Sequence, residues 1–122
     1  MILADTSIWV DHLRGGDAKL VELLGAGAIL THPFVIGEIA LGSLSRRDEI
    51  LENLRDLPAV SIATDDEVLE FIERRALHGR GIGYVDCHLL ASMTLTPGAT
   101  LWTRDKRLRA VAADMGALSL ED

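Results

Sequence analysis

The chain has 122 residues, enough for one domain and too few for two independent cores. Hydrophobic residues make up 48% and charged residues 25%, a composition that excludes a disordered chain. Twelve Lys and Arg against 19 Asp and Glu give a net charge of −7, which argues against a passive nucleic-acid coat, because such a protein would be basic. The one cysteine, Cys87, excludes an internal disulfide framework and a thiolate zinc cluster.

The N-terminal segment has no basic residues ahead of an apolar stretch, so it does not resemble a secretory signal. No uncharged run approaches the length of a bilayer span. We therefore expect a soluble cytoplasmic protein without a membrane segment, folded as a single domain over residues 1–122.

Short apolar runs alternate with segments of helical periodicity along the whole chain. In chain order the pattern predicts a strand at 1–4, helices at 8–14 and 18–24, a strand at 28–31, helices at 33–44 and 50–57, a strand at 59–62, helices at 65–77 and 84–95, a strand at 99–102, a helix at 105–115 and a candidate fifth strand at 117–120. Strands separated by helices require parallel crossovers. The predicted fold is therefore an α/β protein, a three-layer α/β/α sandwich with a short-stranded, mainly parallel sheet.

Two acidic residues directly follow predicted strands. Asp5 comes after the first strand, and Asp105 comes after the strand at 99–102 through Thr103 and Arg104. In open parallel sheets, sites form at the carboxyl ends of the strands, so we expect these two carboxylates at one edge. Either residue can instead be an N-cap of the helix that follows it.

Two further acids lie among apolar residues on predicted helices. Glu38 is the only acidic or basic residue in the segment 33–44, and its neighbours at helical spacing include Phe34 and Leu41. Asp86 has leucines at helical spacing and falls in the first turn of its helix. A carboxylate on an apolar face is costly unless it is paired or bound to metal. A buried ion pair for Glu38 and an ordinary first-turn role for Asp86 are the structural alternatives.

Four carboxylates that converged on one pocket would repel one another. At an effective dielectric near 20, each like-charge pair about 4 Å apart costs about 4 kcal/mol. A bound divalent cation would offset this cost. Because the candidate ligands are all oxygens, Mg²⁺ is favoured over Zn²⁺, with Mn²⁺ as a substitute.

Four segments occur in the order seen in PIN-domain proteins: Ile2-Leu3-Ala4-Asp5-Thr6-Ser7, Val35-Ile36-Gly37-Glu38-Ile39-Ala40-Leu41-Gly42, Asp86-x-x-Leu-Leu-Ala, and Leu101-Trp102-Thr103-Arg104-Asp105. The chain resembles a VapC-type toxin, the ribonuclease half of a VapBC toxin–antitoxin pair. The resemblance extends from Met1 to about Met115 and implies a PIN-like fold.

By that resemblance, the acidic quartet that binds metal and carries catalysis is Asp5, Glu38, Asp86 and Asp105. The hydroxyl positions beside the metal correspond to Thr6, Ser7 and Thr103. The family implies a Mg²⁺-dependent endoribonuclease that cleaves RNA with a metal-activated water and leaves 5′-phosphate and 3′-hydroxyl ends. Whether one or two ions take part stays open.

RNA phosphates need positive charge outside the acidic pocket. The candidates are Arg80 in a Gly-rich loop and Arg104, Lys106 and Arg107 at the last helix. An ordinary solvated face is the alternative for each of them.

Other functional classes remain as alternatives. A phospho-acceptor receiver domain is also a small acidic α/β protein, but it needs paired acids after the first strand, where Asp5 stands alone. A catalytically vestigial PIN-like binding module would keep the fold without the chemistry.

The resemblance also implies partners. One is a cognate VapB-type antitoxin that lays a segment across the toxin and can place an Arg among the acids. The other is a second copy of the chain, because apolar stripes on the helices after Pro33 exceed what a thin sheet covers. Those stripes comprise Ile36, Ile39, Leu44, Ile50, Leu51 and Leu54.

Overall fold

The computed structural model describes residues 1–119. Within them it contains, in chain order, β1 (Ile2–Ala4), α1 (Thr6–Gly15), α2 (Ala18–Gly25), β2 (Ile29–Leu30), α3 (Pro33–Ala40), α4 (Arg47–Arg55), α5 (Asp65–Arg75), α6 (Tyr84–Leu95), β3 (Thr100–Trp102) and α7 (Lys106–Asp114). The strands form one parallel sheet in the order β2-β1-β3, with β1 at its centre. No helix in this part of the chain is long and apolar enough to cross a membrane.

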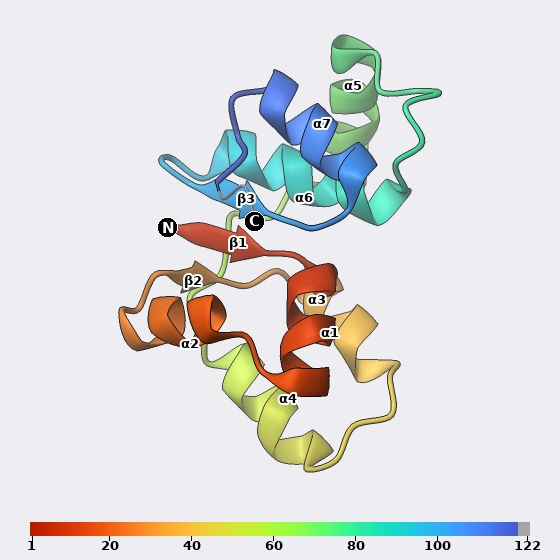
Figure 1. Cartoon of the computed structure of the whole chain (residues 1–122). Helices are drawn as coiled ribbons and strands as arrows, with labels where there is room; N and C mark the ends of the chain where they lie inside the picture. Colours follow the sequence, from red (N-terminus) through yellow and green to blue (C-terminus); the bar gives the residue numbers. More distant parts are fainter. Residues whose placement is uncertain (120–122) are drawn as a thin grey trace.

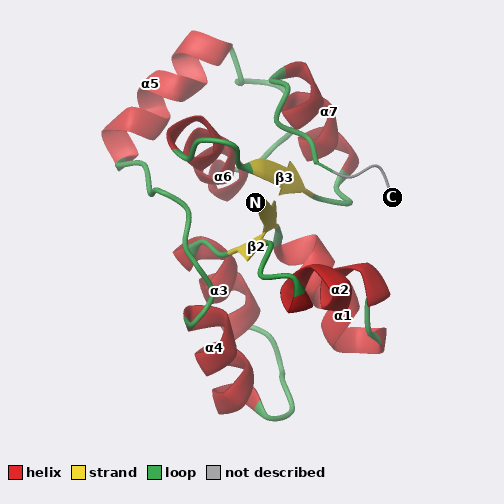
Figure 2. Ribbon diagram, turned by 90° about the vertical axis from the view of Figure 1, so that its left-hand side faces the viewer, coloured by secondary structure: helices red, strands yellow, loops and turns green. Residues whose placement is uncertain are grey.

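Helices cover both faces of the sheet, as the alternating pattern predicts. Seen along the strands, α1, α2 and α7 lie on one side of the sheet and α3, α4, α5 and α6 lie on the other (Figure 2). The path from β1 to β2 crosses one face, and the path from β2 back to β3 crosses the other. The central strand is therefore the point where the strand order reverses, and its carboxyl end is the expected place for a site.

Two of the predicted strands are reduced to single bridges. Ala59 pairs in parallel with Thr31, and Leu118 pairs in parallel with Leu101. The first run turns away at once, because the backbone N–H of Ser61 donates to the Thr96 hydroxyl at 2.9 Å instead of continuing a ladder. The last residue of the fifth predicted strand, at position 120, lies outside the described residues.

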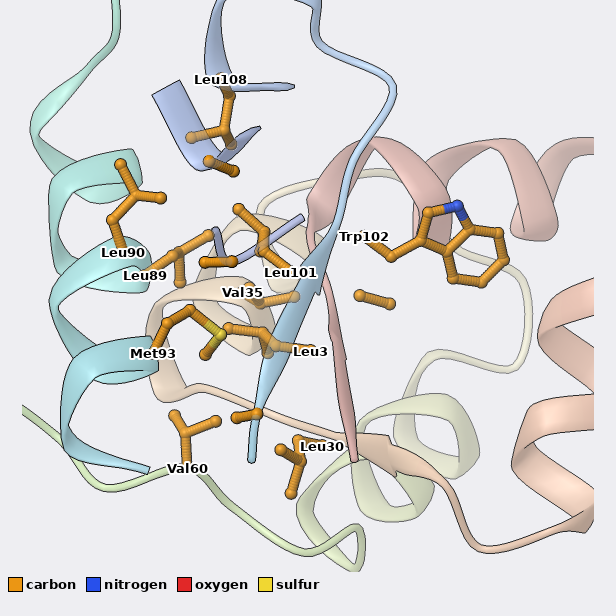
Figure 3. Close-up of a cluster of buried hydrophobic side chains, with 14 of the residues drawn as sticks. Leu3, Leu30, Val35, Val60, Leu89, Leu90, Met93, Leu101, Trp102 and Leu108 are labelled. Carbon is orange, nitrogen blue, oxygen red and sulfur yellow. The ribbon is translucent and has the colours of Figure 1, made fainter. Parts of the chain in front are cut away.

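The core sits on both faces of the sheet. Leu3 and Leu101 are completely buried and point toward α6, whereas Trp102 points to the opposite face (Figure 3). This alternation follows from the two-residue repeat of a strand. The segment that follows β3 is held close to the start of α1, because the Arg104 N–H donates to the Ser7 hydroxyl at 3.1 Å.

Two helix starts follow the predicted signals and one cap was not anticipated, whereas α4 begins at Arg47, three residues before the predicted start, without a side-chain cap. The Thr64 capping box is present, with the Glu67 N–H donating to the Thr64 hydroxyl at 3.1 Å and the Thr64 N–H donating to the Glu67 carboxylate at 2.9 Å. Pro33 occupies the first turn of α3. That helix is capped by buried His32, whose Nδ1 accepts the Phe34 N–H at 2.9 Å. It ends at Ala40, four residues before the predicted end, in a turn at Gly42.

Candidate active site

Asp5 directly follows the central strand and is 5% exposed. One carboxylate oxygen, Oδ1, accepts the Ser7 N–H at 3.0 Å and the Ser7 hydroxyl at 2.5 Å. The other, Oδ2, accepts the Thr103 hydroxyl at 2.5 Å. Burial raises the pKa of Asp5, and the hydrogen bonds from Ser7 and Thr103 oppose that rise. Asp5 is the N-cap of α1, and donors hold both of its carboxylate oxygens.

Glu38 is exposed, which corrects the expectation that its carboxylate lies on a buried apolar face. The neighbours that suggested burial face solvent, since Phe34 is 38% exposed and Leu41 is 89% exposed. Helix α3 covers the sheet with its other side, through Val35 and Ile39. The Glu38 Oε1 accepts the Thr6 hydroxyl at 2.7 Å, so the residue reaches the start of α1 next to Asp5.

Asp86 lies half-buried in the first turn of α6, where its Oδ2 accepts the Gly83 N–H at 3.0 Å. Its pKa is raised, chiefly by burial and then by the negative charges of Asp105, Asp5 and Glu38. Asp86 therefore lies within electrostatic reach of all three other predicted acids. The fold brings together four carboxylates from four separate segments of the chain.

Asp105 caps α7, where its Oδ1 accepts the Leu108 N–H at 2.9 Å. Its own N–H donates to the Thr103 hydroxyl at 3.1 Å, and the same hydroxyl donates to Asp5. Thr103 is completely buried. This one side chain consequently links the ends of the central strand β1 and of β3, and all three predicted hydroxyl residues contact the acids or their immediate backbone.

The acids suit Mg²⁺ by their chemistry, because carboxylate oxygens are the ligands that this hard cation prefers. Among residues 1–119, however, no three Asp, Glu, His or Cys side chains are gathered closely enough to hold a metal ion as they stand. The four carboxylates lie in the same region of the structure, but they do not surround a single position where a metal ion could bind.

The predicted RNA-binding residues divide into two groups. Arg80 is ion-paired with Asp114 at 2.9 Å, and Arg104 is ion-paired with Asp11 at 2.9 Å and with Asp17 at 2.6 Å. Both guanidinium groups are thus engaged within the chain, and a contact of either with RNA stays a prediction.

Lys106 and Arg107, in the first turn of α7, are exposed and stay candidates for RNA contact. The Arg107 side chain lies so close to Gly81 that a Cβ added at this glycine would come within 2.7 Å of Nη1.

Sequence reasoning missed the acidic partners of Arg104. Asp17 is the N-cap of α2, as predicted, since its Oδ1 accepts the Leu20 N–H at 2.9 Å. Its second oxygen takes the ion pair, and Asp11 contributes the other acid from α1. No local pattern signals these contacts, because 87 and 93 positions of sequence separate the partners.

A family model described as PIN domain matches residues 2–114 of this chain. The chain therefore belongs to the PIN-domain family, a conclusion that excludes the receiver-domain alternative and confirms the predicted α/β fold. Ribonuclease VapC32 from Mycobacterium tuberculosis is 52% identical over 122 residues, which cover 100% of this chain and 98% of that relative. VapC32 from a second strain of the same organism matches to the same extent. The resemblance to VapC-type toxins is thereby confirmed along the full length.

Proposed function

We propose that this protein is an endoribonuclease toxin that depends on Mg²⁺ and uses Asp5, Glu38, Asp86 and Asp105. The observation that carries the proposal is the hydrogen bonding that places three of these acids near one end of the sheet: Thr6 donates to Glu38, and Thr103 donates to Asp5 and accepts the Asp105 N–H. The negative charges of these three acids also contribute to the raised pKa of Asp86. The name of the relative, a ribonuclease of the VapC type, supports the same activity.

The four acids differ in how firmly hydrogen bonds hold their carboxylates, and this suggests different roles. Asp5 is the fixed ligand, because donors from Ser7 and Thr103 hold both of its oxygens in place. Asp86 is held at one oxygen by Gly83 and keeps the other for a ligand. Glu38 and Asp105 are exposed, and each accepts a hydrogen bond, Glu38 from the Thr6 hydroxyl and Asp105 from the Leu108 N–H. Mg²⁺, when bound, would lower the pKa of a water and offset charge on the phosphate.

A cleavage assay with defined single-stranded RNA tests the activity and the site together. We expect cleavage with Mg²⁺, none with EDTA, and 5′-phosphate ends on the products. Asp5→Asn and Asp86→Asn should each abolish cleavage. Asp66→Asn makes the same change at an exposed first-turn position of α5 and should leave cleavage intact.

Cleavage that persisted in both Asp5→Asn and Asp86→Asn would refute the site assignment. Cleavage in EDTA would refute the metal dependence. A wild-type protein that neither cleaves RNA nor binds Mn²⁺ in calorimetry would favour the vestigial binding module.

We also propose inhibition by a VapB-type antitoxin. A groove beside Glu38 supports this partner, because it joins apolar side chains to one acid of the site; its lining includes Val10, Leu13, Glu38, Ile39, Leu44 and Ile50. A peptide that places an Arg next to Glu38 would neutralise the acids in place of a metal. Addition of the antitoxin should block cleavage, and antitoxin that bound without inhibiting would contradict the proposal.

We further propose a homodimer. The apolar stripes predicted from the sequence are not the main support for it. Of the predicted apolar stripes, half of the residues are buried and the others, Ile36, Leu44 and Ile50, are partly buried against the chain's own core, so only part of this face is open to a partner. The support is instead the exposure of large apolar residues elsewhere, among them Phe34 at 38%, Leu41 at 89% and Tyr84 at 47%. Light scattering at micromolar concentration should give a dimer mass, and a monomer would contradict it.

A further inference from the structure

The segment between β3 and α7 carries two site residues on either side of an arginine. Thr103 donates to Asp5, Asp105 is one of the four acids, and Arg104 stands between them. This segment passes beside the end of β1 and the start of α1 (Figure 1). The backbone contacts agree, since the Asp5 N–H donates to the Trp102 carbonyl at 3.0 Å and the Arg104 N–H donates to the Ser7 hydroxyl at 3.1 Å.

The Arg104 side chain leaves this segment toward α1 and α2, where it meets two acids. Its Nη1 donates to Asp11 at 2.9 Å and its Nη2 donates to Asp17 at 2.6 Å. The Asp17 side chain is only 12% exposed and that of Arg104 only 27%, so this contact is well shielded from solvent. The guanidinium also lies over the Trp102 ring, with Cζ 5.5 Å from the ring centroid. Arg104 lowers the pKa of Asp17, as a close opposite charge should.

We propose that Arg104 is a positioning residue that ties the β3–α7 segment to α1 and α2 through Asp11 and Asp17, and thereby fixes Asp105 and Thr103 relative to Asp5. The inference rests on the proposed nuclease function and goes beyond it. It replaces the expectation that Arg104 contacts RNA phosphate.

The planar fork of arginine suits this role. Two separate N–H groups reach carboxylates on two different helices while the face of the group covers Trp102. A lysine ammonium is a point charge that reproduces neither the fork nor the stacking. Arg104→Lys should therefore lose activity if Arg104 positions the segment. It should keep activity if Arg104 serves only as a positive charge for RNA phosphate.

The two roles predict opposite results for Asp17→Asn. If Arg104 binds RNA, loss of the Asp17 charge releases the guanidinium and removes a repulsive acid, so the KM for RNA should fall. If Arg104 positions the segment, the same variant should lower kcat by between about 10-fold and 100-fold, the range expected for a small displacement of reacting groups, with KM unchanged. Arg104→Met, which also loses the Asp11 contact, should lower kcat at least as much, and the double variant should be no worse than Arg104→Met alone.

Two matched controls break exposed ion pairs elsewhere. Glu49→Gln removes the 2.6 Å contact with Arg46, and Arg74→Met removes the 3.6 Å contact with Glu70. Neither should change kcat or KM. An Asp17→Asn variant with a lower KM, or additive losses in the double variant, would overturn the proposal.

A second measurement does not depend on the nuclease activity. Amide hydrogen exchange should show less protection at Arg104 and Asp105 in both Arg104→Met and Asp17→Asn, because those N–H groups bind the Ser7 and Thr103 hydroxyls. The Leu101 N–H, which donates within the sheet region to the Ala117 carbonyl at 2.7 Å, should keep its protection. Unchanged exchange at Arg104 and Asp105 would refute the positioning role even if the wild-type protein cleaved no RNA, whereas loss of protection in an inactive protein would refute only the proposed function.

Discussion

Replacement of Thr103 by valine should destabilise the protein, because the hydroxyl of this completely buried residue serves both Asp5 and Asp105. Valine keeps the shape of the side chain, so no cavity term enters. The variant loses a 2.5 Å hydrogen bond to a buried carboxylate and leaves the Asp105 N–H without its 3.1 Å acceptor. Hydrogen bonds to charged groups contribute about 1.5–3 kcal/mol, so we expect a loss of about 2 kcal/mol.

For a chain of 122 residues, a loss of about 2 kcal/mol corresponds to a fall in Tm of about 8 °C. Differential scanning calorimetry measures it directly. The fall relative to wild type should shrink at acid pH, because Thr103 favours the ionised form of Asp5, whose pKa burial raises. Protonation of Asp5 removes the charge that the hydroxyl stabilises.

Thr31→Val is the matched control, since within the described residues the buried Thr31 hydroxyl has no hydrogen-bond partner. That variant should melt at or above the wild-type temperature. Equal Tm values for Thr103→Val and Thr31→Val would show that the Thr103 hydroxyl does not support Asp5, and the link between β1 and β3 would have to be abandoned.

Three further predictions use other residues. Asp86→Asn should raise the Tm in EDTA, because it relieves repulsion among the acids. Mg²⁺ at a hundredfold over its Kd should stabilise the wild-type protein by about 2.7 kcal/mol, and the variant should lose most of this stabilisation. An Asp86→Asn protein that is destabilised in EDTA and stabilised by Mg²⁺ like wild type would contradict this prediction. Burial lowers the pKa of His32 from 6.5 to about 4, so the unfolded chain takes up the proton first and stability should fall by roughly 3 kcal/mol between those pH values. The variant His32→Asn can still cap α3. Its free energy of unfolding, measured by urea titration, should fall less than that of the wild type as the pH is lowered. Gly81→Ala should cost about 1–2 kcal/mol in the free energy of unfolding, because φ is +79°, a backbone conformation that residues with a Cβ rarely adopt; an unchanged urea midpoint would contradict this strain.

The sequence predicted what depends on local pattern. Alternation of strands and helices predicted the parallel sheet, and the position of Asp5 after an apolar run predicted its place at the edge of that sheet. Glu38 was predicted to be near the other acids but was wrongly expected to be buried, because periodicity cannot tell which side of a short helix the sheet will cover. The third strand was wrongly expected to be a full strand for a similar reason. Its regular pairing is limited to the bridge at Ala59, and the Ser61 N–H donates instead to the Thr96 hydroxyl, 35 positions away in the sequence.

Capping and catalysis were treated as competing explanations for Asp5 and Asp105. Both residues are N-caps in the structure, and the caps leave the proposed catalytic role possible. A helix that begins where a parallel strand ends needs an acceptor at that point, and an aspartate there is held with its second oxygen directed away from the helix. In Asp5 that oxygen meets Thr103, next to the segment that carries Asp105. The cap therefore fixes the carboxylate without using all of its acceptor capacity. Asparagine caps helices as well as aspartate does, so Asp→Asn variants at these positions remove the charge and keep the fold, whereas Asp→Ala variants would confound the two.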